Sequence, residues 1–331
     1  MSITIKDVAK EAGVSVATVS RVLNGSCNVS DESTKKVNET IARLNYSPNF
    51  LGRNLRKCET NVILVIMPTS EHSLYSKIVM GMQEYAGKVG YDIITAVSYS
   101  TSTAETRQMN MLFNRTVDGV ILLGTQYDAA SLNKLAENYN VALCCEGVEG
   151  ANVLTVAVDD EQAAFDAVAA LIKKGHKRIG FIGTNSSAIS STARENGYIR
   201  ALKEYGIEIK NEYIYKESYD YDCGGRAFEY FNALDEKPTA IFAVSDLLAI
   251  SAMHKAIDMG IDVGKDVAIM GFDNISMCEW IIPTLSTVEQ PCSKMGELVV
   301  AKLIENMNKT TKDNHYYTVD HRIILRESTG D

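Results

Sequence analysis

The chain has 331 residues, of which 46% are hydrophobic and 23% charged, as is typical of soluble globular proteins with two or three domains. No stretch approaches the roughly 18 uninterrupted apolar residues of a membrane span, and the first 25 residues lack the apolar core of a signal peptide, so we expect a cytoplasmic protein. The seven cysteines show neither CxxC nor a Cys/His spacing that binds metals. We therefore expect reduced thiols, no metal site and no cofactor.

The net charge of −9 is unevenly distributed along the chain. Residues 1–58 carry nine Lys or Arg against five Asp or Glu, a net charge of +4, whereas the remainder carries 24 against 37, a net charge of −13. A basic N-terminal module on an acidic protein indicates that this module alone meets a polyanion. A solvated basic tail is the alternative.

The first 46 residues have the pattern of three helices. Each begins after a residue that can cap a helix, and the first two are separated by the tight turn Gly13-Val14-Ser15. Two short helices joined by such a turn and followed by a third are typical of a helix-turn-helix bundle. The predicted helices are 5–12 after Thr4, 16–23 after Ser15 and 31–44 after Ser30.

A short segment with little helical stability of its own follows this bundle. Ser47-Pro48 ends the third helix, and residues 49–57 have the length of about two helical turns, which is too short to be stable alone. Gly52 lowers the helical stability of this segment by a further ~1 kcal/mol relative to Ala. We therefore predict a headpiece over residues 1–46 and a hinge helix over residues 47–58.

From residue 61 onward, apolar runs alternate with amphipathic helical patterns. This alternation predicts parallel sheets with helical crossovers, and near-continuous apolar runs are typical of strands covered on both faces. About 270 residues of this pattern are too long for one sheet and predict two α/β lobes. The predicted strands are 62–66, 93–97, 117–123, 141–144, 178–182, 240–244 and 267–270, and clear helical patterns cover 75–88, 163–174 and 247–259.

The second predicted helix carries the side chains of a helix that reads DNA. Small residues let such a helix enter the major groove, hydroxyls such as those of Thr18 and Ser20 suit phosphates, and Arg21 suits O6 and N7 of guanine. An ordinary three-helix bundle is the alternative. The positions that we expect to face inward are Val19, Val22 and Leu23.

These segments resemble the LacI/GalR family of repressors, and within it the catabolite control branch. The resemblance implies an N-terminal all-α helix-turn-helix headpiece and an α/β, two-lobed, periplasmic-binding-protein-like effector domain with two parallel sheets and helices on both faces. The implied lobes are 59–159 with 288–318, and 160–287 with 319–331. The segments that carry the resemblance are 7–24, 28–30, 44–49, 156–162, 175–183, 237–241, 269–274 and 283–291.

The resemblance also implies how the headpiece contacts operator DNA. The hinge would fold into a helix only when two subunits lie side by side in the minor groove, with Arg53 near the groove wall. Leu55 would wedge between the central base pairs and kink the duplex. The implied DNA contacts are Thr4, Ser15, Val16, Ala17, Thr18, Ser20, Arg21, Asn24, Asn28, Ser30, Tyr46, Asn49, Arg53 and Leu55.

A small-molecule site is expected where several predicted strands end. A sugar or sugar phosphate needs carboxylates for its hydroxyls, a guanidinium for an anion or ring oxygen, and aromatic faces for the sugar plane. Ligand binding is expected to move the lobes about crossing strands near Asp159, Val288 and Thr318 and so to decide whether two hinges pair. The candidate effector contacts, which match pocket positions of the family, are Leu74, Tyr75, Glu146, Ser190, Arg194, Tyr219, Ser245, Asp246 and Asp273.

The catabolite control branch implies one more partner, a serine-phosphorylated phosphocarrier protein that an Arg of the branch receives. In this chain Ala301 stands where that Arg is expected, and Cys292-Ser293-Lys294-Met295-Gly296 follows Gln290-Pro291 in place of the Tyr-Asp pair of the branch. Without a guanidinium, a phosphoserine loses its bidentate partner. The sequence therefore argues against this partner.

These observations predict a homodimeric repressor that binds a pseudo-palindromic operator and responds to a sugar or sugar phosphate, in carbon catabolite control. A local operon repressor is the first alternative, and a sugar-binding module without DNA function is the second. An enzyme is not expected, because Gly87-Lys-Val-Gly90 and Gly180-Phe-Ile-Gly183 are not GxGxxG, no Walker loop occurs, and His176 has no nucleophile pattern nearby.

Overall fold

The computed structural model describes residues 3–23, 29–46, 59–185, 188–309 and 312–330. The chain forms two compact units, Met1–Thr60 and Asn61–Asp331, which we call the head and the body. The predicted hinge at residues 47–58 lies outside the described residues, and so do five of the implied DNA contacts, namely Asn24, Asn28, Asn49, Arg53 and Leu55.

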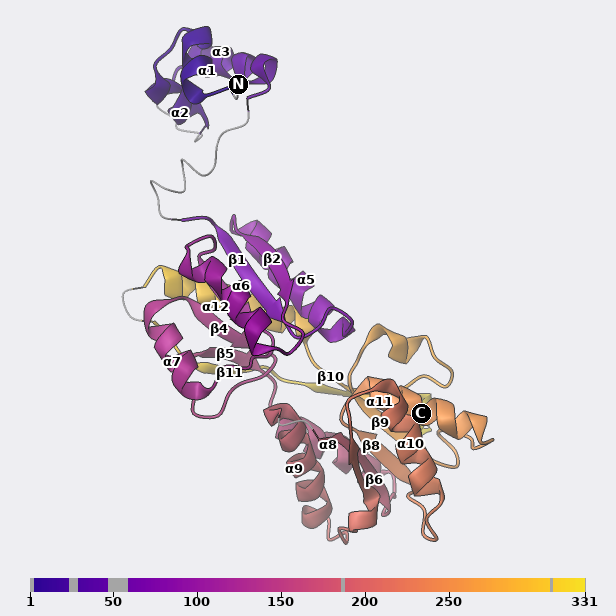
Figure 1. Ribbon diagram of the computed structural model, residues 1–331. Coiled ribbons are helices and arrows are strands. Elements are labelled where there is room, and N and C mark those ends of the chain that lie inside the picture. Colours follow the sequence, from indigo (N-terminus) through magenta and orange to yellow (C-terminus); the bar gives the residue numbers. More distant parts are fainter. Residues whose placement is uncertain (1–2, 24–28, 47–58, 186–187, 310–311, 331) are drawn as a thin grey trace. The chain divides into compact units, whose positions relative to one another are not determined.

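The described residues of the head form three helices, α1 (Ile5–Ala12), α2 (Val16–Leu23) and α3 (Asp31–Leu44) (Figure 1). Asp7 accepts hydrogen bonds from the backbone N–H and the hydroxyl of Thr4 at 2.8 and 2.7 Å, and these bonds fix the start of α1. Gly13, with φ of 69°, ends α1 in the left-handed conformation. The three predicted helices are confirmed in their bounds.

A small apolar core holds the three helices of the head together. Val8 and Ala9 of α1 pack against Val19 of α2 and Val37 of α3. Val22 and Leu23 lie partly buried against the same cluster, so the predicted inward face of α2 is confirmed. The opposite face of α2 is therefore left for solvent or a partner.

The first lobe of the body is a six-stranded sheet whose strand pairs are all parallel. One apolar cluster packs α5 and α12 on one face of the sheet, and a second cluster packs α6 and α7 on the other. The strands, in sheet order, are β11 (Tyr316–Thr318), β5 (Leu154–Ala157), β4 (Val141–Cys144), β3 (Gly119–Leu122), β1 (Val62–Met67) and β2 (Asp92–Val97). The helices are α5 (Ser73–Lys88), α6 (Ser102–Phe113), α7 (Ala129–Asn138) and α12 (Cys292–Met307).

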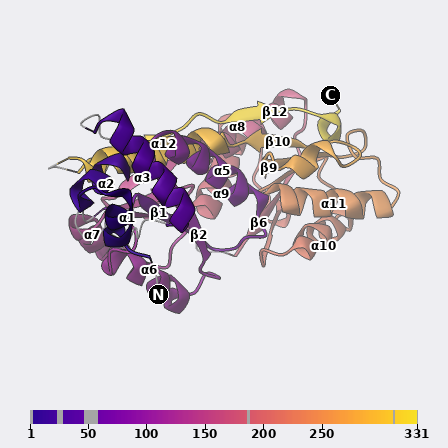
Figure 2. The same ribbon diagram turned by 90° about the horizontal axis from the view of Figure 1, so that it is seen from above.

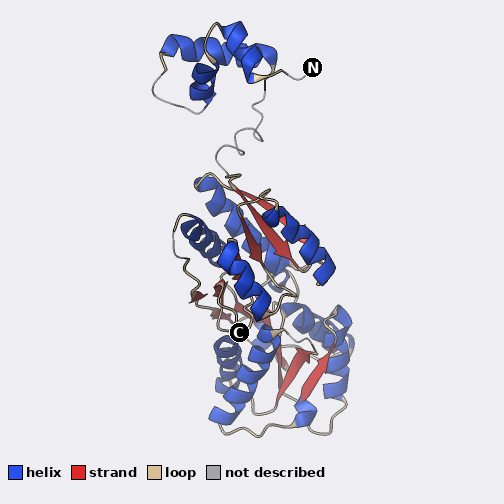
Figure 3. Cartoon of the chain, turned by 60° about the vertical axis from the view of Figure 1, so that its left-hand side comes forward, coloured by secondary structure: helices blue, strands red, loops and turns tan. Residues whose placement is uncertain are grey.

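The second lobe repeats this plan, with helices on both sides of a six-stranded sheet (Figure 3). Its one departure from the predicted parallel arrangement is the edge strand β12, which pairs antiparallel with β10. The strands, in sheet order, are β12 (Arg322–Ile324), β10 (Ser286–Glu289), β9 (Ala268–Asp273), β8 (Ala240–Ala243), β6 (Ile179–Thr184) and β7 (Ile214–Glu217). The helices are α8 (Asp160–Lys173), α9 (Ile189–Glu204), α10 (Tyr221–Asn232) and α11 (Asp246–Asp258), with short 3-10 turns η1 (Asn211–Tyr213), η2 (Ser276–Glu279) and η3 (Glu327–Thr329).

The chain passes between the two lobes three times, after β5, after β10 and after β11. We predicted the second passage at residue 288, but it comes after Glu289, because Val288 and Glu289 pair with Phe272 and Asp273 of β9 in the sheet of the second lobe. The two lobes, joined by these three passages, form one compact unit.

Two glycines let α5 and α12 cross at very close range, and the two helices lie side by side in the first lobe (Figure 2). A Cβ atom at Gly81 of α5 would lie 2.2 Å from the Ser293 carbonyl oxygen, and one at Gly296 of α12 would lie 2.2 Å from the Ile78 carbonyl oxygen. Only glycine fits at such an approach of two backbones.

Among the described residues, no helix combines the length and the apolar character needed to cross a bilayer.

Candidate functional site

The outer face of α2 carries most of the implied DNA contacts that the structure describes. Val16 is 41% exposed, Ala17 and Arg21 are exposed, and Thr18 and Ser20 are half-buried. Within the described part of the head, Arg43 forms an ion pair with Glu11 at 3.1 Å, whereas Arg21 has no ion-pair partner. The guanidinium of Arg21 is therefore available to an external acceptor.

Hydroxyl side chains mark the starts of the helices in the head. The Ser15 hydroxyl accepts a hydrogen bond from the Thr18 N–H at 3.0 Å and lies 2.9 Å from the Thr18 hydroxyl. The Ser30 hydroxyl accepts from the Ser33 N–H at 3.3 Å, while Thr4 precedes α1 as described above. Because helix N-termini attract anions, these exposed ends are suited to phosphate oxygens. Tyr46, another implied DNA contact, is partly buried and packs against the apolar core of the head.

A cleft of about 640 Å³ lies between the two lobes of the body. It is bordered by residues that directly follow β1, β2, β3, β4 and β8 and by the last residues of β6 and β9, at the carboxyl ends of these parallel strands. This is where open α/β sheets bind ligands. Seven of the nine predicted effector contacts line the cleft, namely Leu74, Tyr75, Glu146, Ser190, Arg194, Tyr219 and Asp273.

Arg194 of α9 is held in one position by several contacts. Its Nε donates to Asp160 Oδ1 at 2.7 Å, and its Nη1 donates to the Val244 carbonyl oxygen at 2.6 Å and lies 3.8 Å from Asp273 Oδ1. The guanidinium also lies over the Phe272 ring, 3.7 Å from its centre. Burial acts to lower the pKa of Arg194, but Asp160 and Asp273 outweigh burial and hold the pKa above its ordinary value. Arg194 is therefore a fixed, charged wall of the cleft.

Asp273 ends β9 in an unusual backbone conformation. Its φ is 119° and that of Asn274 is 52°, a region that non-glycine residues rarely adopt. The residue is 3% exposed, and its Oδ1 accepts a hydrogen bond from Gln290 Nε2 at 2.7 Å. Burial raises the pKa of Asp273, while Arg194 and His72 oppose the rise. Backbone strain of this kind is commonly found at ligand sites, where the surrounding structure holds it in place.

His72, which the sequence did not single out, joins the two lobes across the cleft. Its Nε2 lies 2.8 Å from the Tyr219 hydroxyl and 3.7 Å from Asp273 Oδ2, and both of these residues belong to the second lobe. Its ring lies near Tyr75, with 5.4 Å between the ring centres. The only signal in the sequence was its place before α5, where its Nδ1 accepts from the Leu74 N–H at 3.4 Å, but His is not among the preferred capping residues.

Two further contacts bridge the lobes beside the cleft. Glu146 of the first lobe accepts hydrogen bonds from the backbone N–H and the hydroxyl of Ser190, both at 3.4 Å. Lys77 of α5 donates to the Asn274 carbonyl oxygen at 2.7 Å. Contacts of His72, Glu146 and Lys77 therefore link the two lobes across and beside the cleft.

Ser245 and Asp246, which we predicted as effector contacts, are not among the residues that line the cleft. The Ser245 hydroxyl caps α11 by accepting from the Leu248 N–H at 3.4 Å. Asp246 is fully buried and accepts from the Ile275 N–H at 2.8 Å and from the Thr287 hydroxyl. Both residues hold the second lobe together, because at a strand end a polar residue can cap the next helix as readily as it can face a ligand.

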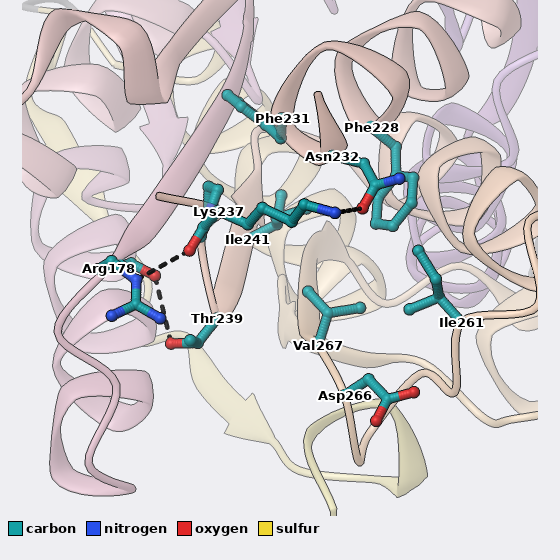
Figure 4. A pocket seen from close by; sticks show the side chains of 11 residues that line it. Arg178, Phe228, Phe231, Asn232, Lys237, Thr239, Ile241, Ile261, Asp266 and Val267 are labelled. Atoms are coloured by element: carbon teal, nitrogen blue, oxygen red, sulfur yellow. Dashed lines mark hydrogen bonds between the residues drawn. The ribbon is translucent and has the colours of Figure 1, made fainter. Parts of the chain in front are cut away.

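A second hollow, of about 360 Å³, lies at the amino ends of β6, β8 and β9 in the second lobe (Figure 4). Its apolar floor includes Phe228, Phe231 and Ile241, which are at most 3% exposed. The polar groups at its rim bond to one another, since Lys237 Nζ donates to Asn232 Oδ1 at 2.9 Å and Arg178 Nε donates to the Lys237 carbonyl oxygen at 2.8 Å. The interlobe cleft, with polar groups from both lobes, is the stronger candidate for a ligand site.

Comparison with known proteins agrees with this architecture. Residues 4–49 match the bacterial regulatory proteins of the lacI family, and residues 168–329 match a periplasmic binding protein-like domain. Catabolite control protein A of Priestia megaterium is 38% identical over 331 residues, which are 99% of this chain and 100% of that protein.

Solved structures show the same fold over almost the whole chain. The complex of the transcriptional regulator CelR with cellobiose has a TM-score of 0.74 and 27% identity, and the match covers 98% of this chain and 99% of that one. The lac repressor dimer bound to operator and the anti-inducer ONPF has a TM-score of 0.89 and 23% identity, with 99% of both chains covered. With a relative this similar over its full length, the chain belongs to the lacI family of bacterial regulatory proteins.

Proposed function

We propose that this regulator is a repressor that binds a pseudo-palindromic operator as a homodimer and responds to a small polyhydroxylated effector in the interlobe cleft. The exposed face of α2 carries the proposal, because it presents Val16, Ala17 and an unpaired Arg21 on a helix whose other face is buried in the core of the head. A helix with this division enters the major groove in helix-turn-helix proteins.

Charge supports the same role for the head. Residues 1–58 have a net charge of +4 in a chain whose net charge is −9. Positive charge in one module raises its affinity for the phosphate backbone, while the acidic remainder limits contact with DNA to that module. In the proposed complex Ser15 and Thr18 lie near phosphates, and Arg21 donates to the edge of a base.

An exposed apolar patch in the second lobe supports the homodimer. Met277, Trp280 and Ile282 are 45%, 76% and 87% exposed; Met277 lies in η2, Trp280 directly follows it, and Ile282 is two residues further along. A patch that combines an exposed Trp with an exposed Ile is typical of an interaction surface. A pseudo-palindromic operator requires a protein dimer with two-fold symmetry. In the proposed dimer, this patch contacts the same patch of a second subunit.

The cleft provides the link between effector and DNA binding. Ligand contacts to both walls change the relative stability of the lobe orientations that the three passages allow, and a ligand shifts this equilibrium only by its difference in affinity for them. The match to CelR, whose solved structure contains cellobiose, supports a carbohydrate as the effector.

The similarity to catabolite control protein A supports a role in carbon catabolite control. The residues of this chain do not support the phosphocarrier interaction of that branch. Ala301 lies half-buried on α12, where the resemblance expects an Arg, so this surface lacks the guanidinium that a phosphoserine requires. We infer that the cleft, and not a phosphorylated protein, controls this regulator, and this favours local operon control as the second candidate function.

The test begins with selection of duplexes that the full-length protein retains, followed by binding isotherms at several salt concentrations. Arg21→Ala is expected to weaken binding to the selected operator by about 1–3 kcal/mol and to relax the preference at one base pair. Lys35→Ala, which removes an exposed positive charge from α3, is the matched control and should leave the base preference unchanged. Failure to retain any duplex in a salt-sensitive manner would refute the proposed function.

A further inference from the structure

The charged groups that line the cleft are mainly acidic. Among the described lining residues, Asp128, Glu146 and Asp273 carry carboxylates, whereas Arg194 alone is a lysine or arginine. His72 is the one other lining residue that can carry positive charge. A cleft with this composition has a negative potential, which its low-dielectric walls strengthen.

Arg194 does not offer a spare positive charge to a ligand. Its guanidinium lies between two buried carboxylates, at 2.7 Å from Asp160 Oδ1 and 3.8 Å from Asp273 Oδ1. These three groups together carry a net charge of −1 when both carboxylates are ionised. A phosphate beside Arg194 would therefore also face Asp273, and repulsion by that carboxylate would offset the attraction of the guanidinium.

Glu146 is a carboxylate without a cation. It is half-buried in the wall of the first lobe, and within the described residues it has no ion-pair partner and accepts only the two 3.4 Å hydrogen bonds from Ser190. Its charge adds to the effect of burial in raising the pKa of Tyr75, which also lines the cleft. A half-buried carboxylate with two long hydrogen bonds gains most from a charged donor.

The remaining lining groups suit a hydroxylated molecule with a positive charge. The rings of His72 and Tyr219 are stacked, with 6.2 Å between their centres, and the ring of Tyr75 lies 5.4 Å from that of His72. Aromatic faces attract both sugar planes and cations.

We propose that the effector is a polyhydroxylated molecule with a protonated amine, in the chemical class of the aminosugars, and that sugar phosphates are excluded. The amine binds Glu146, while Arg194 and Asp273 donate to and accept from the hydroxyls. This inference rests on the proposed function, because it assigns a ligand class to the cleft of the proposed repressor.

The test uses isothermal titration of the full-length protein with three matched sets of sugars. Each set contains the neutral sugar, its 2-amino form and its 6-phosphate, built on glucose, galactose and mannose. We expect at least one amino form to bind at least about tenfold more tightly than its neutral parent, as a charge-assisted hydrogen bond provides. Tighter binding of any 6-phosphate than of its parent, or no binding by any amino form, would overturn the proposal.

Two variants identify the group that recognises the amine. Glu146→Gln keeps the shape of the side chain and is expected to remove the tenfold preference for the amino form, with thermal unfolding as the check on folding. Glu149→Gln removes an exposed carboxylate three residues away that does not line the cleft, and it should keep the preference. An equal preference in wild type and Glu146→Gln would contradict the assignment.

Operator binding by the ligand-free wild type is measured in parallel by fluorescence anisotropy. Operator binding without a preference for amines refutes the ligand class alone. A preference for amines without operator binding refutes the proposed function alone. The two failures are therefore distinguishable in one set of preparations.

Discussion

Replacing Arg194 by Ala leaves Asp160 and Asp273 without the cation that both contact. These carboxylates belong to residues that are 9% and 3% exposed, so water replaces the guanidinium poorly. Removing one partner from a buried ion pair typically destabilises a protein by about 3–5 kcal/mol. At about 2–4 °C per kcal/mol for a unit of this size, the Tm is expected to fall by about 6–20 °C.

The loss depends on pH in a direction that the structure fixes. Burial raises the pKa of Asp160 and of Asp273, and Arg194 opposes both shifts, so its removal raises both values further. A carboxyl whose pKa is higher in the folded protein than in the unfolded protein favours folding when it is protonated. We therefore expect the stability difference between wild type and Arg194→Ala to be largest near neutral pH and to shrink as the pH falls through the raised pKa values of these carboxyls.

The assay is denaturant or thermal unfolding of both proteins across this pH range, with Arg200→Ala as the control. Arg200 lies on the same helix, and its side chain is 34% exposed and pairs with Glu161 at 2.6 Å. A pair this exposed contributes about 0–1 kcal/mol. Equal losses in the two variants, or a loss in Arg194→Ala that does not change with pH, would refute the reasoning.

The other predictions concern helix packing and association. Gly81→Ala places a Cβ 2.2 Å from the Ser293 carbonyl oxygen and should lower the free energy of unfolding by about 1–3 kcal/mol. Gly87→Ala is the control on the same helix. Its Cβ meets nothing within 4 Å, and the change should raise the free energy of unfolding by about 0.4–1 kcal/mol. Similar effects of the two changes in urea unfolding would contradict the close crossing. Trp280→Asp should weaken self-association at least about tenfold in analytical ultracentrifugation while changing the stability of the subunit by under about 0.5 kcal/mol. A dimer of unchanged strength would exclude this patch from the interface.

Most buried strands were predicted from the sequence, but the buried strands β5 and β10 and several edge strands were not. β3, β4 and β8 are buried at every position, so each appears as an apolar run. β7 and β12 are edge strands of the second lobe and have no fully buried residue, so no apolar run or clear alternation marks them. Pairing with a neighbouring strand, and not their own composition, makes them strands.

The cleft was predicted in part, because sequence position indicates which strand end a residue occupies but not which way its side chain points. Arg194 and Asp273 were predicted as effector contacts, and the structure brings them together. Asp160 pairs with Arg194 from another helix, and His72 reaches Tyr219 from the other lobe, so both roles depend on tertiary contacts that no local pattern contains. Ser245 and Asp246 were predicted as effector contacts because they are polar residues at a strand end. In the structure their side chains accept backbone hydrogen bonds within the second lobe.

The three passages between the lobes also determine the order in which parts of the chain can fold during synthesis. The head is complete once α3 has been made, but the first lobe lacks α12 and β11 until residue 318, after nearly all of the second lobe. The second lobe in turn lacks β12 until residue 324. On the ribosome, the apolar side of α5 and β1 is therefore covered only by a helix encoded some 200 residues later, and until then it is exposed to aggregation.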